Sequence, residues 1–124
     1  MISNHPVNGA IRFLLELGAI TTFAVWGFHQ AESGTGILLA ILMPVSFAVV
    51  WGVFAVKDDP SRSGKTVVPT PGIIRLLLEL FLFAAATWML RDLGYLKVWW
   101  IFGGITLIHY IISYDRVLWL LKQK

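Results

Sequence analysis

The chain has 124 residues, of which 57% are hydrophobic and only 14% are charged. Soluble domains carry about 25% charged residues, so this composition excludes an ordinary water-soluble domain and favours a membrane protein. Without cysteine the chain has no disulfides and no thiolate chemistry, and we attribute its net charge of +3 to membrane-flanking loops rather than to nucleic-acid binding.

The first predicted membrane span covers residues 7–28. It begins at Pro6 or Asn8 and ends at the polar stretch that starts with His29. The segment has no basic region before its apolar run and no small-residue cleavage site after it. We therefore expect a retained span rather than a cleaved signal peptide.

The second predicted span covers residues 37–56 and has Pro44 near its middle. Proline removes a backbone hydrogen bond, so we expect a kink there. Residues 57–71 are charged and rich in proline and glycine, which predicts a loop. No strand is expected, because the apolar runs are too long and lack alternation.

The third and fourth predicted spans cover residues 72–90 and 95–121, joined by a tight turn at residues 91–94. At about 20 residues per bilayer crossing, four spans with short connections use almost the whole chain. We therefore expect one integral membrane domain over residues 1–124 with no separate soluble domain.

One phrase occurs twice in the chain. Residues 9–17 read GAIRFLLEL and residues 72–80 read GIIRLLLEL, with seven of nine positions identical. Because each copy opens a two-span unit, both copies enter the membrane in the same direction. The sequence thus predicts an all-α transmembrane four-helix bundle, built from two two-helix repeats related by a pseudo-twofold axis along the membrane normal.

Each copy of the phrase carries an arginine and a glutamate four residues apart, Arg12 with Glu16 and Arg75 with Glu79. A charge within the hydrocarbon costs about 2.5–3.5 kcal/mol on insertion scales, so we expect the four charges to be buried against one another. Arginine before glutamate is the less favourable order within one helix. We therefore predict two pairs between helices, Arg12 with Glu79 and Arg75 with Glu16.

The fourth span adds polar residues at a similar depth. His109, Ser113 and Arg116 follow one another at helical spacing and share a face, while Tyr110 and Tyr114 form the adjoining stripe. Together with the two arginine–glutamate pairs, these residues predict a polar layer in one half of the bundle.

Two interpretations of this layer remain open. Its charges either line a site for a polar solute or a proton, as in a small transporter or a component of one, or they only fix helix packing in a structural or accessory subunit. An enzyme is the third choice, since no catalytic, metal-binding or phosphate-binding motif occurs. We expect no cofactor, because His5, His29 and His109 lie at different depths and do not form a haem-binding pair. A transporter with four spans would need a homo-oligomer or a larger membrane partner.

Basic residues predict the orientation in the cell membrane. The side of both termini and the long loop carries five of them, whereas the other side carries only Arg91 and Lys97; the five are Lys57, Arg62, Lys65, Lys122 and Lys124. The positive-inside rule therefore places both termini in the cytoplasm. Trp51, Tyr114 and Trp119 are predicted to anchor the chain at the inner interface.

Several phrases of the chain resemble the YrdB-like family of small bacterial four-span membrane proteins. The matching parts are Asn8 with residues 12–17, Pro44, residues 51–54 and residues 75–83. The resemblance is looser in the fourth span. It implies a membrane location and a four-span topology, and it implies no chemistry, because the family is one of unknown function.

Overall fold

The computed structural model describes residues 5–57, 59 and 66–123, and these residues form an almost wholly helical fold. Five helices and two very short strands follow one another in the order α1 (Pro6–His29), α2 (Ser33–Val53), β1 (Phe54–Ala55), β2 (Val68–Pro69), α3 (Gly72–Asp92), α4 (Val98–Ile112) and α5 (Tyr114–Lys122).

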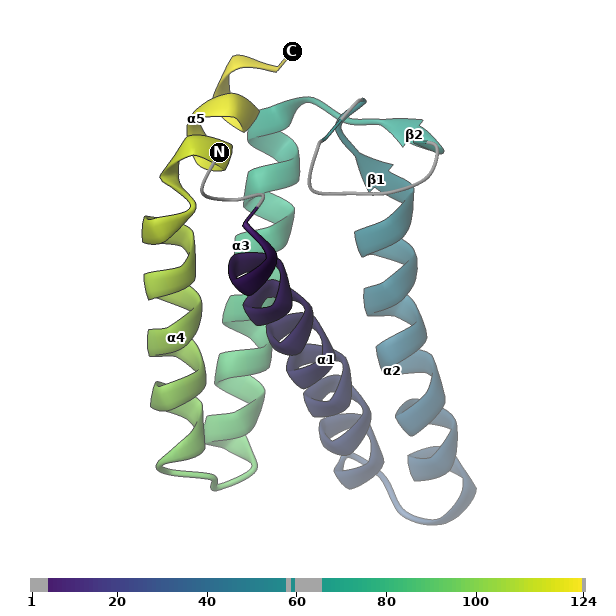
Figure 1. Cartoon of the computed structure of the whole chain (residues 1–124). Coiled ribbons are helices and arrows are strands. Elements are labelled where there is room, and N and C mark those ends of the chain that lie inside the picture. The colour runs from purple at the N-terminus through teal and green to yellow at the C-terminus, as the bar shows by residue number, and fades with distance from the viewer. Residues whose placement is uncertain (1–4, 58, 60–65, 124) are drawn as a thin grey trace.

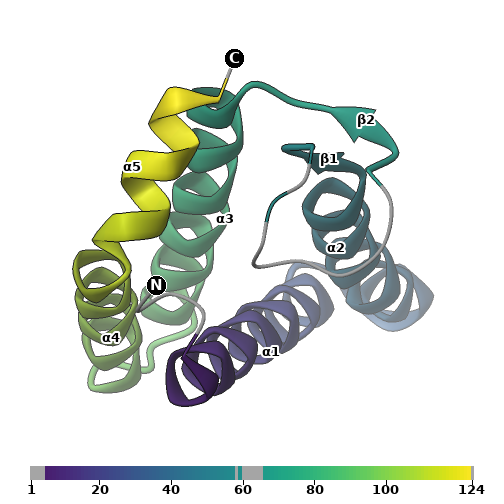
Figure 2. The ribbon, with the colours of Figure 1, turned by 45° about the horizontal axis from the view of Figure 1, so that its top comes forward.

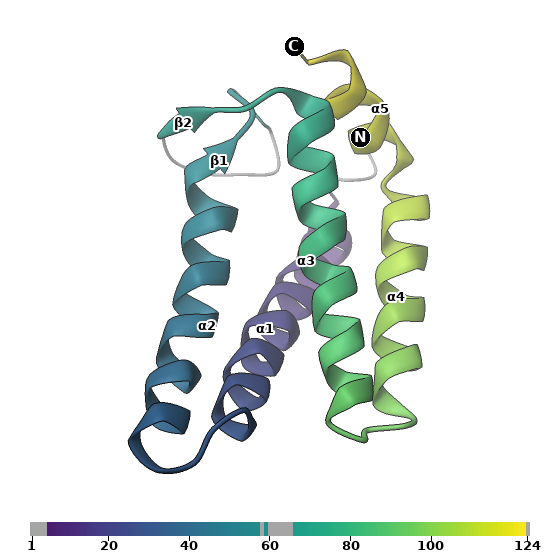
Figure 3. The ribbon, with the colours of Figure 1, turned by 180° about the vertical axis from the view of Figure 1, so that it is seen from behind.

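Two helical hairpins make up most of the molecule (Figure 1). Helix α1 returns through a short turn into α2, and α3 returns through residues 93–97 into α4. The start of α1, both strands and α5 lie at one end, and the two turns lie at the other (Figure 1). Seen from behind, α3 stands between α2 and α4, while α1 crosses the bundle at a tilt (Figure 3).

Helices α1, α2 and α3 are long and apolar enough to cross a membrane, whereas α4 is apolar but only 15 residues long. Helices α1, α2 and α3 have 24, 21 and 21 residues, which meets the requirement of about 20 residues for a bilayer crossing. Much of their apolar surface faces outward, most of all on α2, where only Gly36 and Phe47 are buried. Such a surface suits lipid and not water.

Local chemistry fixes the ends of the helices. Helix α1 begins with Pro6, and the side chain of His5 accepts a hydrogen bond from the backbone N–H of Val7 at 3.2 Å. At the far end of the α3–α4 hairpin, Gly94 adopts a φ of 87°, a left-handed conformation that favours glycine. The turn was predicted at residues 91–94, which is two residues too early at its start, because α3 continues through Asp92.

Two predictions about secondary structure were wrong. Residues 54–55 and 68–69 pair as a two-stranded parallel sheet, because α2 ends at Val53 and its extended continuation meets the segment that leads into α3. The fourth span is also not one helix. It breaks at Ser113, whose ψ of 30° is not helical, and α5 then turns to run alongside the start of α3 (Figure 2).

The main core lies where α1, α2 and α3 meet. Phe23, Phe47 and Phe83 fill it, with Phe23 and Phe47 in edge-to-face contact at 5.1 Å between ring centroids. Helix α2 runs unbroken through Pro44. A second, smaller cluster of Val56, Leu76 and Leu120 joins the strand end to α3 and α5. Between these two apolar regions lies the polar cluster described next.

Candidate charged cluster

One carboxylate gathers charged and polar side chains from every helix but α2. We call this group the Glu79 cluster, and its members are Arg12, Glu16, Asp59, Arg75, Glu79, Tyr110 and Arg116. Three arginines and three carboxylates give a formal charge of zero. The cluster lies at the end of the molecule that carries the strands and α5.

Glu79 is completely buried, and both of its oxygens are bound. Arg116 donates to Oε1 and Oε2 at 2.8 Å each, the two-pronged geometry that matches a guanidinium to a carboxylate. Tyr110 donates to Oε1 at 2.7 Å, and Nε of Arg75 donates to Oε2 at 2.7 Å. Arg12 approaches Oε2 at 3.5 Å. Four donor side chains from four helices thus converge on one carboxylate.

Arg75 connects this carboxylate to the end of α2. Its Nη1 donates to the carbonyl oxygens of Trp51 at 2.6 Å and Phe54 at 2.7 Å. Carbonyls in the last turn of a helix have no partner within that helix, and a cation there also favours the helix dipole. Arg75 therefore caps the end of α2, although α2 contributes no charged side chain of its own.

The ring of Trp51 lies against two of the arginines. The guanidinium carbon of Arg75 is 4.5 Å from the ring centroid and that of Arg12 is 5.5 Å away, both within the range of cation–π attraction. The same ring stacks on Phe47 and meets Phe83 edge-on. Trp51, for which an interfacial position remains a prediction, forms a packed wall of the cluster, because α2 turns this face toward α3.

The predicted pairing of the repeated charges is only half present. Arg12 reaches Glu79 across helices, as expected, but Arg75 binds Glu79 of its own helix. Glu16 in turn accepts from Nε of Arg12 at 3.2 Å within α1. The disfavoured order within one helix is outweighed here, because burial leaves each arginine few other acceptors. The two copies of the phrase therefore do not play equivalent roles.

Sequence reasoning missed one member of the cluster, Asp59, and did not place Trp51 beside it. Asp59 follows the strand β1, and its Oδ2 accepts from Nη2 of Arg116 at 2.8 Å with only 6% of the residue exposed. A signal for it existed: the predicted polar layer held three arginines but only two glutamates, which called for a third carboxylate. Trp51 could have been found from its depth in the second span, which matches that of Arg12 and Arg75.

Three further predicted site residues, namely Ser113, His109 and Tyr114, are not members of the Glu79 cluster. Ser113 is buried and accepts from Nδ2 of Asn8 at 2.9 Å, which ties the break between α4 and α5 to the start of α1. His109 is buried beside Tyr110, and its Nδ1 has no hydrogen-bond partner among the described residues. Tyr114 is 57% exposed and is not part of the cluster.

The chemistry open to this arrangement is limited. Within residues 5–57, 59 and 66–123, no three histidine, cysteine or acidic side chains come close enough to hold a metal ion. The guanidinium and carboxylate groups neutralise one another, and Glu79 and Arg75 are sealed from outside. Among the described members of the cluster, the Arg12–Glu16 arm is partly accessible, with side chains 13% and 21% exposed, and Tyr110 is half-buried.

Comparison with known proteins identifies the family of the chain. Residues 10–107 match the family described as "Protein of unknown function (DUF2568)". The chain is also 40% identical over 120 residues to "Uncharacterized protein YrdB" of Bacillus subtilis (strain 168), which covers 96% of this chain and 97% of that protein. No solved structure matches the chain. The resemblance to YrdB-like proteins that the sequence indicated is confirmed, and the chain belongs to the DUF2568 family.

Proposed function

We propose that this protein is a structural or accessory subunit of a protein assembly in the cell membrane. Its Glu79 cluster serves to hold the helices together. The supporting observation is the saturation of Glu79, which has no exposed surface and accepts from Tyr110, Arg75 and Arg116 while Arg12 closes its remaining side. A transport site needs a position that a solute or a proton can enter. The central carboxylate offers none.

The proposal includes the topology. Helices α1–α4 cross the bilayer as a single four-helix domain, with two hairpins related by a pseudo-twofold axis along the membrane normal and both termini in the cytoplasm. The repeated phrase at the start of α1 and α3 supports the repeat, and Lys57 and Lys122 at the end of the strands and α5 support the orientation. Arg62, Lys65 and Lys124, which enter the same count, lie outside the described residues.

The proposal also includes a binding partner in the membrane. Helix α2 packs chiefly on α1 and leaves most of its apolar surface uncovered, so a homo-oligomer or a larger membrane protein has room to dock there without disturbing the Glu79 cluster. Native mass spectrometry from a mild detergent reads the subunit count directly.

The central test replaces Glu79 by glutamine. The amide puts an N–H₂ donor where buried arginines donate, so we expect Glu79→Gln to lower the free energy of unfolding by about 3–5 kcal/mol. Glu32→Gln is the matched control, because Glu32 is exposed before α2 and its side chain makes no capping hydrogen bond. Denaturant titration in detergent measures both variants, and an equal stability of Glu79→Gln and the wild type would refute the locking role.

A second candidate function is a proton or small-solute site, which the partly exposed Arg12–Glu16 arm and the unpartnered Nδ1 of His109 favour. Proteoliposomes with an imposed pH gradient distinguish the two. Under our proposal the wild type dissipates the gradient no faster than empty vesicles. Flux in the wild type that is lost in a folded Glu16→Gln variant would overturn the structural proposal in favour of this site.

A further inference from the structure

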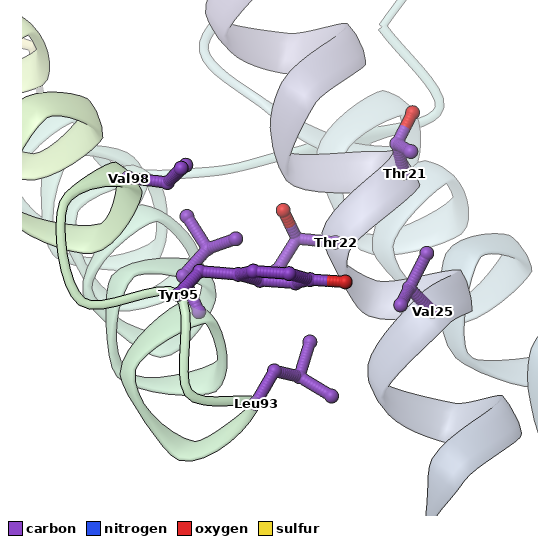
Figure 4. A pocket seen from close by; sticks show the side chains of 7 residues that line it. Thr21, Thr22, Val25, Leu93, Tyr95 and Val98 are labelled. Carbon is purple, nitrogen blue, oxygen red and sulfur yellow. The ribbon is translucent and has the colours of Figure 1, made fainter.

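A cavity lies at the end of the molecule opposite the Glu79 cluster. It has a volume of about 210 Å³ and opens between α1 and the α3–α4 turn; its lining residues are Thr21, Thr22, Val25, Leu90, Leu93, Tyr95 and Val98. In Figure 4 the ring of Tyr95 extends from the turn toward α1, with Thr22 on one side of it and Leu93 on the other. For comparison, an apolar cavity of about 150 Å³ in another protein admits benzene.

The wall of this cavity is apolar in effect. Thr22 is buried, and its hydroxyl donates to the carbonyl of Gly18 at 2.7 Å, which satisfies its hydrogen and leaves its methyl group to face neighbours. Valine and leucine side chains from α1, α3 and α4 supply most of the remaining surface. The hydroxyls of Thr21 and Tyr95 are the remaining side-chain polar groups of the lining, so a polar solute would regain few of the hydrogen bonds that it loses with its hydration, and the cavity suits a hydrocarbon group.

Two basic residues are neighbours in sequence of residues that line the cavity. Lys97 immediately precedes the lining residue Val98 and is exposed, and Arg91 immediately follows the lining residue Leu90. Arg91 is exposed as well, with its guanidinium 5.4 Å from the ring centroid of Trp99. These are the two basic residues that the sequence places on this side of the membrane. An apolar cavity at an end of the molecule that also carries two exposed cations is complementary to a molecule with a hydrocarbon chain and a negatively charged head.

We propose that this cavity is a binding site for an anionic phospholipid, with an acyl chain between α1 and the α3–α4 turn and the phosphate beside Lys97. Helices α1 and α3, which border the cavity, are long and apolar enough to cross a membrane, which gives the acyl chain direct access from the lipid phase. The site is separate from the Glu79 cluster and does not depend on the function proposed for that cluster.

A photoreactive phosphatidylglycerol with a diazirine on its acyl chain tests the site in nanodiscs. Crosslinks should map to peptides containing Val25 or Tyr95, and the same probe with a phosphatidylcholine head should label them about tenfold less, since tenfold corresponds to about 1.4 kcal/mol of recognition. Equal labelling by the two heads would overturn the proposal, as would labelling spread evenly over all helices.

Matched variants separate the two parts of the site. Val25→Phe fills the cavity and should reduce labelling about tenfold, because the acyl chain loses its apolar contacts. Val49→Phe makes the same change on the exposed face of α2 and should leave labelling unchanged. If Val25→Phe misfolds, Lys97→Gln still tests the proposed lipid site, because Lys97 is exposed. Lys122→Gln at the other end of the molecule is its control. Labelling that Lys97→Gln leaves at the wild-type level would refute recognition of the phosphate.

Discussion

At the scale of single residues, the protein depends on arginines that each bind several acceptors at fixed positions. Arg116 binds both oxygens of Glu79 and also Asp59, and Arg75 binds Glu79 and two carbonyls at the end of α2. A lysine ammonium is a point charge and cannot reproduce such a planar fork. The identity of these side chains, and not only their charge, should therefore decide stability.

Replacement of Arg116 by lysine tests this point. We expect Arg116→Lys to lower the free energy of unfolding by about 2 kcal/mol, because the ammonium cannot hold both Glu79 oxygens and Asp59 at once. Arg91→Lys changes an exposed arginine at the other end and should shift stability by no more than about 0.5 kcal/mol. Thermal unfolding followed by circular dichroism in detergent measures both; similar values for the two variants would contradict the importance of the fork.

At the scale of elements, the contact of α5 with the start of α3 distinguishes the two halves of the repeat. The N–H of Gly72 donates to the carbonyl of Gln123 at 3.0 Å, and a Cβ at Gly72 would overlap the carbonyl oxygen of Leu120. At the matching position of the first repeat, Gly9, a Cβ would meet nothing within 4 Å. The same glycine in the same phrase is thus required in one copy and dispensable in the other.

These two glycines give a prediction with its control built in. Gly72→Ala should force α5 away from α3 and cost about 2 kcal/mol or more, the usual range for overpacking. Gly9→Ala lies inside α1 with open space around it and should stabilise the helix by about 0.5–1 kcal/mol. Denaturant titration of both variants is sufficient. A neutral Gly72→Ala would mean that α5 does not pack where the structure has it.

At the scale of the whole molecule, one end is charged and interlocked and the other is bounded by turns and an apolar cavity. The end with the strands and α5 holds the Glu79 cluster, in which one carboxylate joins α1, α3, α4 and α5, while Asp59 ties in the segment after β1. At the opposite end, the indole N–H of Trp26 donates to Asp92 at 2.9 Å and ties the hairpins together near the residues that line the cavity. We therefore expect the two hairpins to be held together chiefly from the end that carries the Glu79 cluster.

The orientation is testable because the chain contains no cysteine. Gln30→Cys introduces a thiol at the α1–α2 turn, and Gln123→Cys introduces one after α5 at the other end. With both termini in the cytoplasm, a membrane-impermeant maleimide should label only Gln30→Cys in intact cells and both variants after lysis. The unmodified chain should remain unlabelled throughout, and the reverse pattern would contradict the orientation.

The sequence by itself was sufficient for the first three long helices and for the main charged residues. Long apolar runs predicted helices at residues 7–28, 37–56 and 72–90, and the structure has them within a few residues, because such runs leave the backbone no other way to satisfy its hydrogen bonds in lipid. The repeated Arg-xxx-Glu spacing likewise singled out Arg12 and Glu79, which do meet. Both inferences rest on local composition and spacing, which the sequence states directly.

Only the tertiary structure decided which charged side chains bind one another. Whether Arg75 binds Glu16 or Glu79 depends on how α1 and α3 are rotated and tilted, and no spacing encodes that rotation. The break at Ser113 arises because α5 gains more by bringing Arg116 to Glu79 and Leu120 to Gly72 than by continuing α4. Asp59 belongs to the Glu79 cluster because a buried third arginine needs a third carboxylate. The chain path after β1 brings Asp59 within reach of Arg116.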